Sequence, residues 1–300
     1  MVGSGVLSAM NDLRISINYQ QKFVGVKRRS DIYWKTIGTV KSNLTATTAK
    51  TVSMKLERQR RQQNVEGDFY VDQKCINCDV CRWMAPQVFT LVDRKSVVYK
   101  QPSCEEESLH ALLSCPTGSI HTEKPARDIL EAQETFLLSI DEQRIPGVYH
   151  CGYHSEASYG DTSYFITHPD GNILVDSPRY TERLAHKIEF LGGVHYMFLT
   201  HKDDVADHKK WSKKLGCHRV LHSQDGCVSL FYKPLKVMFT GDHFGKEQSE
   251  LSIWVQYNHD SVPRQLESVR KLLDFEFEWI LPVSLSTSGI GISTHNCIFV

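Results

Sequence analysis

Four cysteines of this 300-residue chain have the spacing of a metal-cluster site. Cys75, Cys78 and Cys81 form a C-x2-C-x2-C run, and Cys115 lies further along the chain, followed directly by Pro116. Three thiolates on one tight loop can bind three corners of an iron–sulfur cubane, and a remote cysteine then supplies the fourth ligand. Four thiolates also bind zinc, but structural zinc sites usually carry two separated C-x2-C pairs. The equal spacing therefore favours an iron–sulfur cluster over zinc.

The same segment resembles single-cluster bacterial-type ferredoxins. The resemblance covers about residues 66–123 and rests on the cysteine run, on residues 85–89 (Ala-Pro-Gln-Val-Phe) and on residues 115–118 (Cys-Pro-Thr-Gly). It implies a [4Fe-4S] cluster that transfers one electron at a time to or from a partner protein, and a three-iron form stays open. Cys104 lies outside the motif and is interpreted as an ordinary thiol.

A second group of potential ligands follows a predicted strand. Residues 199–208 read Leu-Thr-His-Lys-Asp-Asp-Val-Ala-Asp-His and contain His201, Asp203, Asp207 and His208. Imidazole and carboxylate groups at a strand end are typical ligands of zinc or iron where one position must stay open for water. A solvated, charged turn is the alternative interpretation.

Asp242 follows another apolar strand and would place a further carboxylate at a strand end. Residues 147–282 resemble the metallo-β-lactamase fold, whose signature is T-H-x-H-x-D-H, a separate His, G-D and a last His. The resemblance implies a two-metal site, holding zinc or iron, that activates a bridging hydroxide for hydrolysis. It assigns the ligands in chain order to His201, Asp203, the pair Asp207 and His208, and Asp242. Asp207 is also the candidate catalytic residue.

Residues 147–282 depart from the family signature in the spacing of the first ligands and in two missing histidine segments. Two extra residues precede the D-H pair, and the third histidine has no counterpart, with His222 as the nearest substitute. After Pro282 the G-H-G turn of the family is missing, and His295 is assigned no ligand role. We therefore hypothesise a shortened or alternatively spliced form of a ferredoxin fused to a metallo-β-lactamase-fold domain, an arrangement that resembles plant and cyanobacterial proteins.

The first 64 residues have the composition of an organelle transit peptide. They contain twelve Lys or Arg, twelve Ser or Thr and three acidic residues, and such a segment must not be interpreted as fold. A basic disordered tail is the alternative. The first thirty residues lack the apolar run of a secretory signal, so we expect import into the chloroplast, with the mitochondrion as second choice.

Composition narrows the remaining choices. With 35 basic and 35 acidic residues and 41% hydrophobic residues, the chain is an ordinary globular one without a field that favours nucleic acid. Its longest apolar runs are far shorter than the ~20 residues of a membrane-spanning helix, so no membrane partner is expected. Nine cysteines, three of them clustered, indicate a cluster site in a reducing compartment more than a disulfide framework.

The predicted fold class is α+β, with a ferredoxin-like domain followed by an incomplete αββα metallo-β-lactamase sandwich. A strand at 68–72 and a helix at 105–113 frame the cysteine loop. In the second domain, strands at 162–167, 172–176, 196–199, 228–231 and 237–240 alternate with helices at 182–191 and 207–215. The proposed domain ranges are 1–64 (leader), 65–123 (ferredoxin-like), 124–146 (linker helix), 147–282 (second domain) and 283–300 (irregular tail).

Three functions are compatible with these features. The first is a metal-dependent hydrolase of the metallo-β-lactamase superfamily with an attached iron–sulfur domain and a small-molecule substrate. The second is an oxidoreductase in which the second domain holds iron and the ferredoxin domain supplies electrons. The third is a non-catalytic electron carrier or interaction protein, because loss of two ligands out of about seven weakens metal binding.

Overall fold

The computed structural model describes residues 13–16, 58–201, 205–221, 228–247, 250–255 and 261–283. Helices and strands are mixed throughout these ranges in the predicted α+β arrangement. No helix within them is long and apolar enough to cross a membrane. Three positions named above, 203, 222 and 295, lie outside the described residues.

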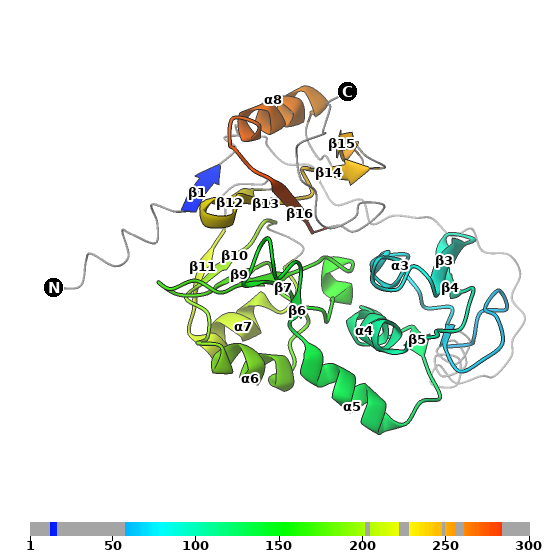
Figure 1. Ribbon diagram of the computed structural model, residues 1–300. Coiled ribbons are helices and arrows are strands. Elements are labelled where there is room, and N and C mark those ends of the chain that lie inside the picture. Colours follow the sequence, from blue (N-terminus) through cyan, green and yellow to red (C-terminus); the bar gives the residue numbers. More distant parts are fainter. Residues whose placement is uncertain are drawn as a thin grey trace, which may run out of the picture.

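The ferredoxin-like domain is a small unit of two short β-ribbons and two helices (Figure 1). Its elements are β2 (Tyr70–Val71), α3 (Val80–Met84), β3 (Phe89–Val92), β4 (Lys95–Val98), α4 (Glu106–Ser114) and β5 (Ile120–His121). β2 pairs with β5 and β3 with β4, both antiparallel. The predicted strand and helix are thus confirmed, and α4 ends just before Pro116 because proline cannot continue a helix.

This domain begins earlier than the expected boundary at residue 64. Arg61 is buried and donates from its guanidinium to the carbonyls of Ser96 and Val92. The Asn64 carboxamide accepts hydrogen bonds from the N–H groups of Val71 and Val98, at 3.0 and 2.9 Å. Residues 58–64 therefore belong to the folded domain, although their basic composition groups them with the leader.

A second part of the expected leader also lies in the fold. β1 (Leu13–Ser16) pairs antiparallel with β12 (Ser229–Tyr232). The short run Leu-Arg-Ile-Ser alternates apolar and polar residues, as a sheet-edge strand does. The average composition of 64 residues does not reveal a strand of only four residues.

The predicted linker helix is present as α5 (Ala126–Thr135). The chain after it does not remain a linker, because β6 (Leu138–Ser139) pairs with β7 (Val148–His150) at the edge of a sheet. Phe136 and Leu137, between the two elements, are buried. The second domain therefore begins near residue 136 and not at 147.

The second domain contains two main sheets. One has six strands in the order β11 (His218–Val220), β10 (Tyr196–Phe198), β9 (Ile173–Val175), β8 (Tyr164–Ile166), β7, β6; the other has four, in the order β1, β12, β13 (Val237–Gly241), β16 (Trp279–Pro282). The strands β14 (Phe244–Glu247) and β15 (Glu250–Ile253) form a separate two-stranded ribbon, whose Phe244 and Leu251 pack with α8 (Val262–Leu272) and β16. All five predicted strands are present, and β16 is a further strand that the sequence analysis does not include.

These sheets stack face to face with helices on both outer sides (Figure 1). The interior between the sheets joins Tyr164, Ile166 and Val175 to Leu230 and Phe239 from the facing sheet. A second apolar layer packs α8 (Val262–Leu272) on the four-stranded sheet, and a third packs α6 (Glu182–Phe190) and α7 (His208–Leu215) on the six-stranded sheet. The order of layers is αββα, as predicted.

Local sequence explains where these helices begin. Thr181 caps α6 by accepting a hydrogen bond from the Leu184 N–H at 3.2 Å, and Ser261 caps α8 in the same way from Arg264 at 3.3 Å. Val269 and Leu272 lie on the buried face of α8, three residues apart. Helix α8 had not been predicted, because its polar residues Gln265 and Ser268 share that buried face.

The boundary at Asn64 yields a stability prediction. Replacing Asn64 with Ala leaves the N–H groups of Val71 and Val98 without their acceptor, so we expect the free energy of unfolding to fall by about 1–3 kcal/mol. Urea unfolding under anaerobic conditions, followed by circular dichroism, measures this. The exposed neighbour Gln62→Ala is the control, and equal stability of the two variants would contradict the assignment of residues 58–64 to the domain.

Candidate functional site

The four motif cysteines line one narrow cavity in the ferredoxin-like domain. Apolar walls come from Val71, Ile76, Val80 and Ile120, and polar ones from Ser96, Thr117 and Ser119. Cys81 and Cys115 are buried, whereas Cys75 and Cys78 are half-buried. The structure therefore brings together all four predicted cluster ligands, although they are separated by up to forty positions in the sequence.

Left-handed backbone conformations shape the loop between these cysteines. Asn77 and Asp79 have φ angles of 63° and 70°, and asparagine and aspartate tolerate this region better than other side-chain-bearing residues do. Asp79 precedes α3 and pairs with Arg82 at 2.5 Å. The residues between the cysteines thus let the chain reverse direction so that successive thiols face one cavity.

Hydrogen bonds reach two of the sulfur atoms. The backbone N–H of Ser119 donates to Cys115 Sγ at 3.2 Å, and Cys81 Sγ lies 3.2 Å from the buried Ser96 hydroxyl. Donors of this kind tune iron–sulfur centres by stabilising negative charge on the sulfur. Neither Ser96 nor Ser119 was singled out from the sequence, because no spacing rule marks them.

Electrostatics also suit this set of donors to a cluster. Burial, with added repulsion from the Cys81 and Cys115 thiolates, raises the pKa of Cys78. Burial raises the pKa of Cys81 to about 12. Cations offset the charge of closely spaced thiolates, and binding of iron does this while releasing protons. The residues therefore fit a [4Fe-4S] cluster.

The second candidate site lies where strands of the two sheets end. His201 follows β10 and Asp242 follows β13, and His201 Nε2 lies 3.2 Å from Asp242 Oδ2. Both side chains are largely buried. The structure thus brings together two of the five predicted ligands, one from each sheet.

A hydrogen-bonded series fixes the orientation of His201. The Thr200 hydroxyl donates to Asp176 Oδ2 at 2.8 Å and lies 2.8 Å from His201 Nδ1. Since the hydroxyl has a single proton, Nδ1 must donate to it. The Nε2 atom of a neutral His201 then directs a lone pair at the Asp242 carboxylate. Only a proton or a metal ion between these two acceptors makes the contact favourable.

Asp176 is a site residue that the sequence motif does not include. It is buried at the end of β9, and its Oδ1 accepts a hydrogen bond from the Thr200 N–H at 2.8 Å. Burial raises the pKa of Asp176 to about 6, and the charge of His201 opposes this rise. Its place directly after an apolar strand was the available signal, because the same rule identified His201 and Asp242.

Asp207 and His208, the D-H pair of the motif, contact other partners than His201 and Asp242. Asp207 accepts a hydrogen bond from the Tyr180 N–H and pairs with Lys210, both at 2.9 Å. His208 begins α7, and its Nδ1 accepts a hydrogen bond from Arg219 at 3.2 Å. Within the described ranges, no three His, Cys, Asp or Glu side chains converge to hold a single metal ion. In a cubane, each thiolate instead binds a different iron.

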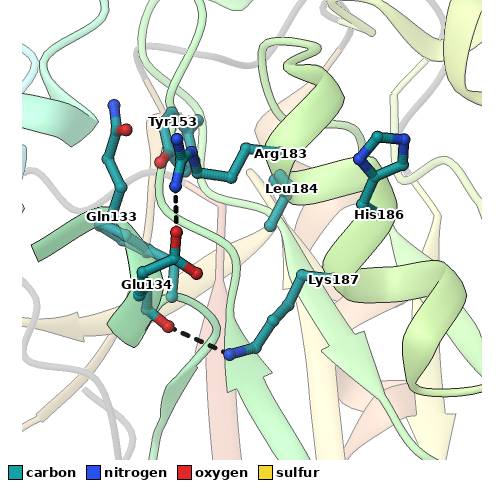
Figure 2. Close-up of a pocket in the computed structure, with 8 residues that line it drawn as sticks. Gln133, Glu134, Tyr153, Arg183, Leu184, His186 and Lys187 are labelled. Atoms are coloured by element: carbon teal, nitrogen blue, oxygen red, sulfur yellow. Dashed lines mark hydrogen bonds and ion pairs between the residues drawn. The ribbon is translucent and has the colours of Figure 1, made fainter. Parts of the chain in front are cut away.

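A cavity of about 510 Å³ lies between α5 and α6 and shares no lining residue with either site (Figure 2). Arg183 forms an ion pair with the Glu134 carboxylate across it, and Lys187 donates to the Glu134 carbonyl at 3.0 Å. Tyr153 and Phe136 contribute the apolar wall. Arg183 and Lys187 therefore both contact Glu134.

Fold and site together define an iron–sulfur domain joined to an αββα sandwich. Residues 71–122 match the family described as the 4Fe-4S single cluster domain of ferredoxin I. This match includes all four motif cysteines, so the predicted ferredoxin-type [4Fe-4S] domain is confirmed. No curated protein matches this sequence.

Solved structures of the metallo-β-lactamase superfamily are similar to about half of the chain. A di-iron-bound form of TTHA1623 is 15% identical and covers 44% of this chain and 89% of its own, with a TM-score of 0.37. An archaeal superfamily protein from Sulfolobus tokodaii is 10% identical, covering 49% and 81%, with a TM-score of 0.35. The mono-zinc form of the metallo-β-lactamase FIM-1 from Pseudomonas aeruginosa is 14% identical, covering 52% and 88%, with a TM-score of 0.36.

The contact between Ser96 and Cys81 leads to a redox prediction. With Cys81 bound as a thiolate, the Ser96 hydroxyl donates to its sulfur and stabilises the more negative, reduced cluster. We expect Ser96→Ala to move the midpoint potential to a more negative value while the iron content stays the same. Redox titration followed by electron paramagnetic resonance measures the shift. Ser103→Ala, at an exposed position, should leave the potential where it is.

Proposed function

We propose that this chain is an electron-transfer protein that exchanges single electrons through a [4Fe-4S] cluster bound by Cys75, Cys78, Cys81 and Cys115. The convergence of these thiols on one cavity is the observation that carries the proposal. The match of this segment to a single-cluster ferredoxin family supports it. The second candidate site brings together only two of its five predicted ligands, His201 and Asp242.

The surroundings of the cavity suit one-electron exchange with another protein. Cys75 is half-buried, and Ile76 next to it is 40% exposed, so one edge of the site faces solvent. A cluster near the surface exchanges electrons with a docked partner without any opening of the fold. We therefore propose a redox protein as the partner.

Anaerobic purification tests the cluster directly. We expect about four irons and about four acid-labile sulfides for each chain. Cys115→Ser should lose most of both, because one iron then lacks its thiolate, whereas Cys104→Ser, at an exposed thiol outside the cavity, should keep them. Zinc in place of iron and sulfide, or equal loss in both variants, would sink the proposal.

A metal-dependent hydrolase is the second candidate. Its support is the His201–Asp242 contact, in which two acceptor atoms face each other at 3.2 Å. A proton or a metal ion between them would make this contact favourable. The described residues supply only two ligands of the predicted set, so they do not yet make a two-metal centre, and we derive no catalytic step from them. A ferredoxin-fed iron oxidoreductase would use the same pair.

Metal analysis of variants decides between an occupied and an inactive second site. If the pair binds metal, wild-type protein should hold zinc or iron beyond the cluster iron, and Asp242→Ala should lose that excess. Asp170→Ala, which removes an exposed carboxylate elsewhere, should retain it. Metal-dependent cleavage of p-nitrophenyl phosphate or acetate by the wild type alone would favour the hydrolase. An equal metal content in all three proteins would remove the second candidate.

A further inference from the structure

A loop of the second domain presses directly on the cysteine loop. The loop, residues 154–160, leads into β8 and ends at Gly160, whose φ angle is 94°. A Cβ atom placed on Gly160 would lie 2.5 Å from Cys78 Cβ, 3.3 Å from Cys78 Sγ and 3.4 Å from Pro116 Cγ. Real Cβ atoms do not approach other atoms as closely as 2.5 Å, so only glycine allows this contact. Gly160 therefore touches two parts of the cluster motif at once.

His154 holds this loop in place from within the protein interior. Its side chain is fully buried, and its Nδ1 lies 2.7 Å from the carbonyl oxygen of Gly160. Because a carbonyl only accepts, Nδ1 carries the proton. The backbone N–H of His154 donates in turn to the carbonyl of Ser114 at 3.2 Å, next to the ligand Cys115. His154 thus connects the loop to the surroundings of two ligands, to Cys78 through Gly160 and to Cys115 through Ser114.

The protonation state and tautomer of His154 keep this arrangement fixed. Burial lowers its pKa to about 4, so the ring is neutral at physiological pH. His154 Nε2 lies 3.1 Å from Nε2 of His150, which is also buried. With the proton of His154 on Nδ1, its Nε2 accepts and His150 Nε2 donates. The two histidines therefore have defined tautomers, and neither ring is free to turn away from Gly160.

Further contacts surround the same junction. Arg179 of the second domain donates to the carbonyl of Leu113 at 3.1 Å, in the last turn of α4. Lys74, beside the first ligand, pairs with Glu156 of the loop at 3.3 Å. The rings of Trp83 and His150 lie 5.1 Å apart. All of these contacts join the second domain to residues within two positions of a cluster cysteine.

We propose that residues 154–160 complete the cluster site, with Gly160 covering Cys78 and His154 acting as the positioning residue that holds Gly160 there. This rests on the cluster proposed above. A loop packed on a ligand sulfur excludes water from it, and solvent exposure is one of the factors that set the potential of an iron–sulfur centre. The reduced cluster carries the larger negative charge, so water stabilises it more than the oxidised form. Loosening the loop should therefore raise the midpoint potential.

Two pairs of full-length variants test this inference. Gly160→Ala introduces the clash with Cys78, while Gly193→Ala carries similar backbone strain, at a φ angle of 72°, with no atom within 4 Å of the new methyl group. His154→Leu removes the donor to Gly160, while His154→Asn can place a side-chain N–H near the position of Nδ1. The readouts are iron and sulfide content, the electron paramagnetic resonance spectrum of the dithionite-reduced protein, its midpoint potential and the rate of bleaching in air.

We expect Gly160→Ala and His154→Leu to have a more positive potential, an altered spectrum and a several-fold faster bleaching in air. Gly193→Ala should match the wild type, and His154→Asn should restore most of its properties. Unchanged spectra and potentials in Gly160→Ala and His154→Leu would overturn the inference while leaving the cluster itself in place. If Gly160→Ala does not fold, the His154 pair decides alone, and equal behaviour of Leu and Asn there counts against the inference. A wild type without iron and sulfide would instead refute the proposed function.

Discussion

Four thiols that line one narrow cavity place a strong constraint on the rest of the chain. Burial opposes the ionisation of Cys78 and Cys81, and repulsion from the neighbouring thiolates adds to this effect, as their raised pKa values show. Iron cations overcome both effects, so formation of the cluster is also a source of folding free energy. The ferredoxin-like domain depends on this contribution, because a unit of about 60 residues buries too little apolar surface to be very stable by itself.

The second domain supplies what this small core lacks. One continuous apolar cluster runs from Phe69 and Val88 in the ferredoxin-like domain through Phe136 and Cys151 to Leu174 in the six-stranded sheet. The two domains therefore share one apolar interior and are not separate units joined by a linker. The chain between α5 and β6 is part of this shared interior. A fixed interface is also what allows a loop of one domain to pack on a ligand of the other.

The sequence predicted the parts of the fold that depend on local pattern. Apolar strands, the helix before Pro116 and the carboxylates at strand ends were recognised because each is written in consecutive residues. The role of Asn64 and the pairing of Leu138–Ser139 were missed, since both depend on partners far along the chain. The same reason explains Gly160, whose conformation is unremarkable until Cys78 is seen beside it. The motif likewise predicted which residues could bind metal, but not that Asp207 and His208 would be held by Tyr180 and Arg219.

The predicted ligands of the second candidate site differ in whether the structure brings them together, and the elements that hold them explain the difference. His201 is oriented by Thr200 and Asp176, which are themselves tied to the ends of two paired strands, so the sheet alone fixes its direction. Asp207 and His208 instead belong to the start of α7, whose position follows its own packing. A sandwich can therefore retain the His201–Asp242 contact even where the remaining ligands are displaced or missing. Affinity for metal falls steeply when ligands are lost, whereas the cluster cavity still has all four of its thiols. On physical grounds the cluster is the more complete chemical centre of this chain, and the sandwich serves it at least as the support that holds Gly160 against Cys78.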